Sequence, residues 1–156
     1  MSDLHDDGAL AVFERQIDEW LSAMRSSNSA IVAVDHAEPD PMFRARWYVR
    51  MRGEAKDFTT VWITLGQRTL RYETYVMPAP EENVAEVLEN LLRRNEKLIG
   101  AHFSIGAEDA VFLRGEIPLL ALAESELDRI VGSMFAYVEQ SFRPLLRLAF
   151  ASRFAD

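Results

Sequence analysis

The spacing of apolar residues predicts a helix near the start of the chain. Between Gly8 and Ser26, apolar side chains recur at intervals of three and four residues, which places them on one helical face. They are Leu10, Phe13, Ile17, Trp20, Leu21 and Met24. Asp6 or Asp7 can cap the first turn, and the polar cluster at 26–29 ends the helix.

Apolar and polar residues alternate strictly between Phe43 and Arg52. One set comprises Phe43, Ala45, Trp47, Val49 and Met51, and the other comprises Arg44, Arg46, Tyr48, Arg50 and Arg52. A period of two predicts a strand with one buried face. Segments at 58–65 and 68–77 predict two further strands after short turns, which completes an antiparallel meander. A short apolar run at 31–34 can also form a strand, and prolines mark a loop at 35–41.

The next part of the chain predicts a helix followed by a hairpin. Acidic residues at 81–82 open a helix that ends near Asn95, in agreement with the helix dipole. Two short strands at 102–105 and 110–116 flank a loop at 106–109.

A long terminal helix is predicted to begin near Ser125. Ser125 and Asp128 have the spacing of a capping box, with Asp in place of Glu. Gly132 is expected to allow close helix packing, and Pro144 should kink or break the helix. Apolar residues continue to the end, mostly as core, with some available to a dimer interface or a partner: Phe142, Leu145, Leu146, Leu148, Phe150 and Phe154.

The order of these elements predicts an α+β fold. It is helix, three strands, helix, two strands, helix and helical tail (α-β-β-β-α-β-β-α), with a five-stranded antiparallel sheet packed by helices. No repeat or linker divides the sequence, so we expect residues 1–156 to form one domain with its core at about 8–154.

Composition excludes several classes of protein. The chain has 156 residues, a net charge of −8 and no cysteine, so it has neither disulfides nor a thiol nucleophile. No apolar run is long enough to span a membrane, and the start of the sequence lacks a signal-peptide pattern, so we expect a cytoplasmic protein. Residues 43–72 carry +5, which leaves −13 elsewhere and makes nucleic-acid binding unfavourable.

Motifs for catalysis are missing from the sequence. It contains no helical zinc motif, no Gly-x-Ser-x-Gly elbow and no glycine-rich phosphate loop. His36, near Asp35, Glu38 and Asp40, allows an oxygen-rich metal loop, but prolines and the missing EF-hand spacing favour an acidic turn. We predict no catalytic residue, no cofactor and no metal.

The arginine-rich face of the strand at 43–52 is the main candidate site. With Tyr48, it can form a basic, aromatic surface for an acidic peptide or single-stranded nucleic acid. The competing interpretation, which we favour, is a solvated strand face with cross-strand partners such as Glu73. The candidate partner-binding residues are Arg46, Tyr48, Arg50, Arg71 and Glu73.

A second hypothesis is a regulator that senses a small molecule, or an enzyme of unrecognised type. It requires a concave pocket with converging polar groups. The candidates for that pocket are Arg50, Arg71, Glu73, Asn95 and Arg114.

Six segments carry a resemblance to a known family: RWYVR at 46–50, LRYETYVMPAP at 70–80, LLRRN at 91–95, FSIG at 103–106, VFLRGE at 111–116 and LDRIVGS at 127–133. They resemble the actinobacterial branch of the YbjN-domain family, and the order of the elements is similar to the type III secretion chaperone-like fold. The resemblance implies a homodimer with a binding or chaperone-like role, and it offers no catalytic residues. We therefore expect a non-enzymatic, protein-binding, chaperone-like or regulatory adaptor with a protein or peptide partner.

Overall fold

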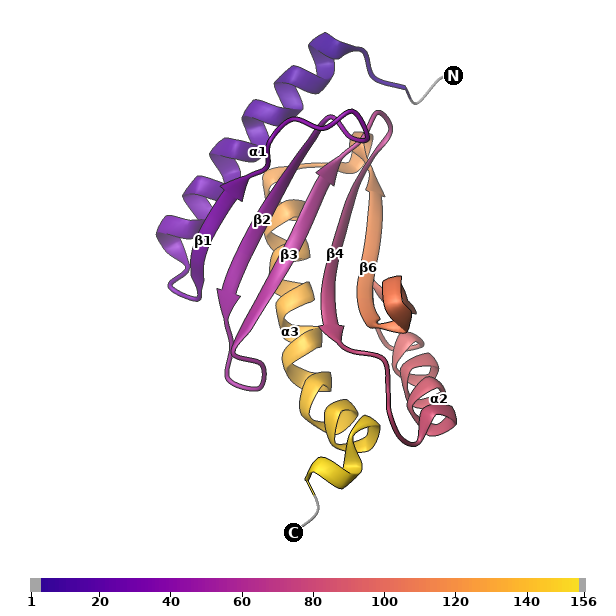
Figure 1. Cartoon of the computed structure of the whole chain (residues 1–156). Helices are drawn as coiled ribbons and strands as arrows, with labels where there is room; N and C mark the ends of the chain where they lie inside the picture. Colours follow the sequence, from indigo (N-terminus) through magenta and orange to yellow (C-terminus); the bar gives the residue numbers. More distant parts are fainter. Residues whose placement is uncertain (1–3, 155–156) are drawn as a thin grey trace.

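The computed structural model describes residues 4–154, which form three helices and six strands (Figure 1). In chain order they are α1 (Asp7–Ser27), β1 (Ile31–His36), β2 (Ala45–Arg52), β3 (Phe58–Leu65), β4 (Thr69–Met77), α2 (Val84–Asn95), β5 (His102–Ile105), β6 (Val111–Pro118) and α3 (Glu124–Ala149). Short 3₁₀ turns follow β5, β6 and α3. The predicted α+β class is confirmed, since the helices pack on an antiparallel sheet.

The sheet has six strands in the order β1-β2-β3-β4-β6-β5, and all neighbours are antiparallel. The prediction of five strands was therefore wrong. The run at 31–34 is part of β1, which extends to His36 and pairs with β2. The run was predicted only as a possible strand, and Asp35 and His36 were assigned to the loop, because an edge strand tolerates exposed polar residues that resemble a loop in sequence.

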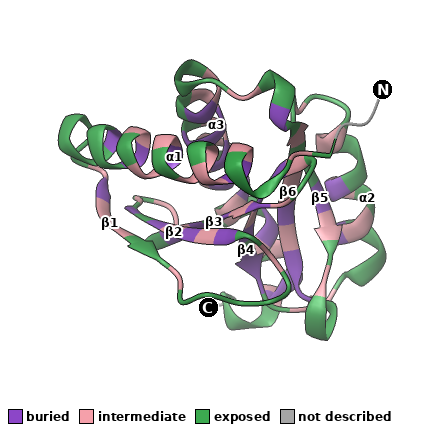
Figure 2. Ribbon diagram, turned by 90° about the horizontal axis from the view of Figure 1, so that it is seen from above, coloured by how far each residue is buried: buried purple, intermediate pink, exposed green. Residues whose placement is uncertain are grey.

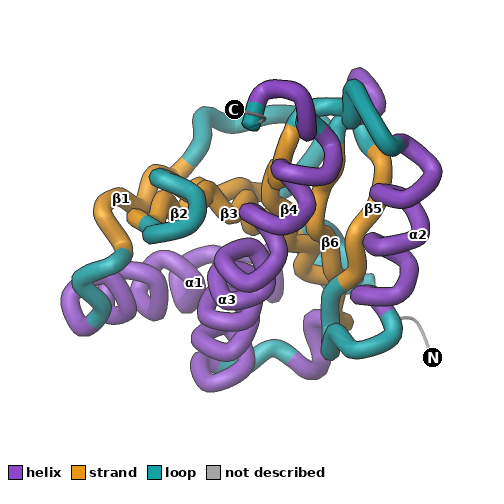
Figure 3. Tube along the Cα trace, turned by 90° about the horizontal axis from the view of Figure 1, so that it is seen from below, coloured by secondary structure: helices purple, strands orange, loops and turns teal. Residues whose placement is uncertain are grey.

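All three helices leave one face of the sheet uncovered. In Figures 2 and 3, α1 and α3 lie on the same side of the sheet, and α2 packs beside β5 at its end. The alternation predicted for β2 is confirmed, because Ala45, Trp47, Val49 and Met51 are buried beneath these helices. The opposite side chains of each strand therefore form an open sheet face.

The predicted start of α1 is confirmed, whereas that of α2 was too early. Asp6 accepts a hydrogen bond from Ala9 N at 2.8 Å and caps α1. The amides of Glu81 and Glu82 instead bond to Ala149 O, which ties this segment to the end of α3. The acidic pair thus serves a tertiary contact, and α2 begins three residues after Glu81.

Two expectations about α3 were wrong. The helix continues through Pro144, which has no N–H to donate to the carbonyl of Gln140. The interruption is tolerated because both residues lie on the exposed side of the helix, near its end. Ser125 is not the cap, since α3 already begins at Glu124 and Ala123 occupies the cap position without a side-chain bond.

Within residues 4–154, no helix combines the length and apolar character that crossing a bilayer requires.

Two glycines differ sharply in their surroundings. A Cβ atom on Gly115, in β6, would lie 2.2 Å from the Tyr72 ring and 2.3 Å from Gly100 O. A Cβ atom on Gly132 would meet nothing within 4 Å, so the expectation of close helix packing there was wrong.

These glycines provide a matched test of the packing. We expect Gly115→Ala to lower the free energy of unfolding by about 1–3 kcal/mol, because the added methyl overpacks the core. Gly132→Ala should raise it by about 0.5–1 kcal/mol, because alanine is favoured in a helix. Urea denaturation measures both values, and equal effects at the two positions would contradict the packing of β6 against β4.

Candidate partner-binding surface

The sheet brings all five candidate side chains to the open face. Tyr48 pairs with Trp62, Trp62 with Glu73, and Glu73 with Arg114, which forms one row across four strands. Arg46, Thr64, Arg71 and Glu116 form the next row, and Arg50 pairs with Thr60. Directly paired residues lie on the same side of a sheet, so these residues share one surface.

The arginines of β2 lie over aromatic rings. The Arg46 guanidinium is 4.2 Å from the Phe43 ring and 5.4 Å from the Trp62 ring, and its Nε donates to Thr64 Oγ1 at 2.9 Å. The guanidinium of Arg50 is 3.9 Å from the centre of the Phe58 ring, and that of Arg52 is 5.6 Å from it. Cation–π attraction holds these groups in place while most of their N–H donors stay available.

Carboxylates are missing around these three arginines. Within residues 4–154, neither Arg46, Arg50 nor Arg52 forms an ion pair. The suggested cross-strand partner Glu73 does not reach them, because β3 lies between β2 and β4. Aromatic rings therefore replace counter-ions on this half of the face.

The other half of the face is neutralised internally. Glu73 Oε2 accepts from Arg114 Nε at 2.8 Å, and Arg71 Nε lies 3.9 Å from Glu116 Oε2. Both ion pairs thus join β4 to β6. The charged candidates therefore fall into two groups. The arginines along β2, called the arginine row below, have no carboxylate partner in residues 4–154, whereas the charged candidates on β4 form ion pairs with residues of β6.

Aromatic residues outside the predicted candidates complete the surface. Phe58 and Trp62 each remain 37% exposed, and Tyr75 remains 43% exposed. Trp62 contacts Tyr48 edge to face at 5.6 Å. Alternation within 58–65 would have found Phe58 and Trp62, because the residues between them are buried apart from Thr60.

The residues suggested for a small-molecule pocket do not converge. Asn95 uses its side-chain amide to bond the backbone of Phe103, at 2.6 Å to the N atom and 3.2 Å to the O atom, which fastens α2 to β5. Arg50, Arg71, Glu73 and Arg114 lie on the open face instead. Asn95 therefore has a structural role.

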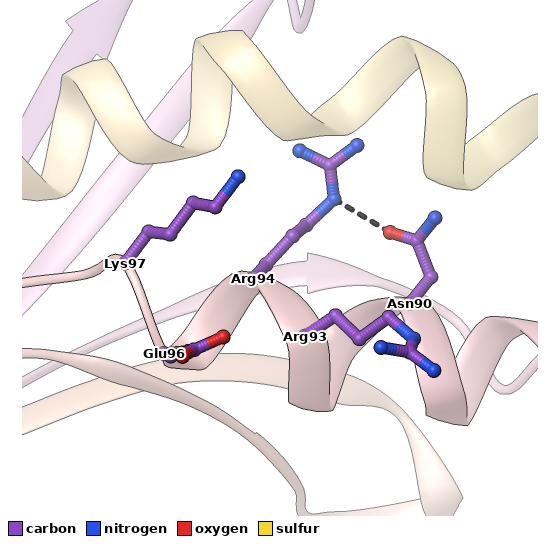
Figure 4. A pocket seen from close by; sticks show the side chains of 5 residues that line it. All are labelled: Asn90, Arg93, Arg94, Glu96 and Lys97. Atoms are coloured by element: carbon purple, nitrogen blue, oxygen red, sulfur yellow. Dashed lines mark hydrogen bonds between the residues drawn. The ribbon is translucent and has the colours of Figure 1, made fainter.

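A hollow of about 460 Å³ lies at the end of α2 (Figure 4). Its lining comprises Asn90, Arg93, Arg94, Glu96 and Lys97. Arg94 extends toward α3, donating to Asn90 Oδ1 at 2.6 Å and to Ser141 Oγ at 3.4 Å. Cations at a helix C-terminus are favoured by its dipole, so this cluster is explained without a ligand.

His36 joins the edge strand β1 to α1. Its Nε2 lies 3.3 Å from Glu14 Oε1, and its Nδ1 lies 3.4 Å from Asp18 Oδ1. The imidazole stacks on Trp47, whose Nε1 donates to Asp18 at 2.6 Å. Across residues 4–154, no three His, Asp or Glu side chains are grouped as metal ligands would be.

Lys56 lies at the margin of the open face, in the turn between β2 and β3. Its Nζ donates to Tyr75 O at 2.7 Å, and it lies 5.1 Å from the Tyr75 ring and 5.8 Å from the Phe142 ring. Burial lowers the pKa of Lys56 from 10.5 to about 8, because the ammonium loses water. The turn itself is held by Glu139 of α3, whose carboxylate accepts hydrogen bonds from the backbone amides of Glu54 and Ala55.

The lowered pKa predicts a pH-dependent stability. Between pH 8 and the unfolded pKa of about 10.4, the unfolded chain holds a proton on Lys56 that the folded chain has lost. The free energy of unfolding, relative to that of Lys56→Met, should therefore rise as pH increases through this interval. Urea denaturation at several pH values measures the difference, with Lys97→Met as the control. A constant difference would contradict the desolvation of Lys56.

A family model matches residues 16–147 of this chain. It is the model of YbjN, described as "Putative bacterial sensory transduction regulator". The chain belongs to the YbjN family. This confirms the resemblance drawn from the sequence segments.

Relatives of this YbjN protein occur in mycobacteria. An uncharacterized protein of Mycobacterium tuberculosis is 33% identical over 67% of this chain, and one of Mycobacterium leprae is 30% identical over 73%. This chain spans only 57% and 61% of their respective lengths. These relatives confirm the actinobacterial branch.

A solved structure is similar in outline. It is the heterodimeric complex ExoU–SpcU from the type III secretion system of Pseudomonas aeruginosa, with a TM-score of 0.48 and 17% identity. The similarity covers 83% of this chain and 96% of that chain.

Proposed function

We propose that this YbjN protein is a non-enzymatic regulatory adaptor that binds an acidic segment of a partner protein on its open sheet face. The observation that carries the proposal is the row formed by Arg46, Arg50 and Arg52, which lie over aromatic rings and have no carboxylate partner in residues 4–154. The family description supports the regulatory part of the proposal. The cytoplasmic location stays a prediction from the sequence.

The geometry of the row suits an extended peptide. Alternate residues on a strand are roughly 6.6–6.8 Å apart, which is also the spacing of alternate side chains in an extended ligand. Acidic residues that meet Arg46, Arg50 and Arg52 would therefore lie four and then two positions apart, with Tyr48 facing the position between the first two. The rings already hold these groups in place, so little conformational entropy is lost on binding.

Charge distribution favours a short acidic segment over nucleic acid. Residues 43–72 carry +5, whereas the remainder carries −13. A long polyanion would extend from the arginine row toward the acidic remainder, and phosphates would be repelled there. A short peptide would stay on the basic area, and salt screens repulsion from charges beyond about 10 Å. Exposed Trp62 beside the row adds an apolar contact for the same segment.

A random-peptide selection tests the proposal without a known partner. We expect selected peptides to be enriched in Asp and Glu relative to the starting library. Arg46→Gln combined with Arg50→Gln should weaken their binding by at least about tenfold, since two charge-assisted hydrogen bonds are lost. Fluorescence anisotropy with a selected peptide measures this loss.

The control removes the same charge on the helical side of the molecule. Arg25→Gln combined with Arg147→Gln should retain the affinity, because both residues belong to helices rather than to the open face. Peptides without acidic enrichment, or equal losses in the two double variants, would contradict the proposal. Binding of single-stranded DNA at about 50 mM salt that depends on Arg46 and Arg50 would assign the face to nucleic acid instead.

The resemblance implies a homodimer, and we further propose that its two copies pair through α2 and β5. Leu92 on α2 is 70% exposed, and Ile99 just beyond the helix is 74% exposed. They accompany a shallow apolar hollow of about 290 Å³ lined by Leu88, Leu91, Leu92, Asn95, Phe103, Ser104 and Ile105. β5 ends the sheet, but Asn95 already bonds the backbone N and O of Phe103, so we expect the apolar side chains rather than the strand edge to form the contact.

The charges of α2 are self-complementary. Acidic residues Glu86 and Glu89 precede the basic residues Arg93, Arg94 and Lys97. Two copies related by a twofold axis, with antiparallel α2 helices, would therefore oppose unlike charges. This arrangement favours a second copy over an unrelated occupant.

The mass in solution tests the pairing. We expect the wild type to have twice its 17.8 kDa chain mass by light scattering, and Leu92→Glu to have the monomer mass, because a buried charge would oppose the interface. Leu120→Glu, at an exposed leucine after β6, should stay dimeric. A monomeric wild type, or a dimeric Leu92→Glu, would exclude this interface.

A further inference from the structure

Lys56 occupies an unusual position for a lysine. The chain has only two lysines, Lys56 and Lys97, among 17 basic residues. The Lys56 side chain packs against rings from two elements, Tyr75 of β4 and Phe142 of α3. Within residues 4–154 it has no carboxylate partner, and the only hydrogen bond of its Nζ goes to Tyr75 O.

The hydrogen bond from Lys56 Nζ to Tyr75 O orients the amine so that it can act as a nucleophile. Beyond Thr74, β4 no longer pairs with β3, and the Nζ hydrogen bond occupies the Tyr75 carbonyl at this point. A neutral amine that donates one N–H to this carbonyl has its lone pair directed elsewhere. With a pKa of about 8, roughly a quarter of Lys56 is neutral at pH 7.5, compared with about one in a thousand for an ordinary lysine.

We propose that Lys56 is a modification site, at which acyl phosphates acylate the amine without an enzyme. The neutral Nζ attacks the carbonyl carbon of the acyl phosphate, and a C–N bond forms. The bond between that carbon and the phosphate oxygen breaks, inorganic phosphate leaves, and water takes the excess proton from Nζ. No oxidant, reductant or metal enters this step.

The modification would act on the margin of the open face. An amide carries no charge, so the cation–π contacts with Tyr75 and Phe142 are lost. Glu139 and Arg143 continue to hold the turn, through the Glu54 and Ala55 amides and the Glu54 carbonyl. Acylation therefore frees the Tyr75 ring without unfolding the turn. The site itself does not depend on the proposed partner binding.

Acetyl phosphate and mass spectrometry test this site in the native protein. At pH 7.5, we expect Lys56 to be acetylated about tenfold faster than the exposed Lys97, because its larger neutral fraction outweighs its weaker basicity. The Lys56 rate should level off above about pH 8–9, where most of the amine is already neutral. In concentrated urea the two lysines should react at similar rates.

Removing the surrounding rings provides the matched variant. Phe142→Ala exposes Lys56 to water and should reduce its rate at pH 7.5 toward that of Lys97. Circular dichroism checks that this variant is folded, and Tyr75→Ala offers an independent removal of the other ring. A native Lys56 that reacts no faster than Lys97 would overturn the proposal, as would a preference that persists in urea.

Discussion

The period-two alternation of the strands is the constraint on which the rest of the structure depends. On β2, a buried Trp47 between Arg46 and Tyr48 fixes both neighbours on the opposite side. Because α1 and α3 cover the Trp47 side, the arginines must face outward. A slip of one residue would bury three guanidinium groups, so the core itself specifies where the basic row lies.

The open face meets two demands with the same side chains. A sheet that is uncovered on one side, with edge strands at β1 and β5, is prone to pair with other sheets. Charged arginines oppose such association, while the rings beneath them would otherwise form an exposed apolar patch. Arg50 over Phe58 illustrates the compromise, since the guanidinium shields the ring and keeps donors for a ligand.

The sequence predicted the face more completely than its internal pairing. Alternation alone located Arg46, Tyr48 and Arg50, and the same rule applied to 58–65 would have located Trp62. The partner of Glu73 is Arg114, which is 41 residues away, and this pairing depends on β6 lying beside β4. Strand order is set by long-range packing, so local patterns could not have supplied it. The extension of β1 to His36 and the passage of α3 through Pro144 were not predicted, because exposed positions tolerate residues that the local rules disfavour.

The arginines of β2 and Lys56 differ in how their charge responds to pH. A guanidinium stays protonated at any physiological pH, so the β2 row is permanently basic. An ammonium that is partly buried without a counter-ion has a pKa within reach of physiological pH, as at Lys56. A binding face built of arginines, with a single responsive amine at its margin beside Tyr75, can keep its affinity for acidic segments while one contact at its edge is changed. Under the two proposals, recognition would depend on the arginines of β2 and regulation on a lysine in the turn that follows this strand.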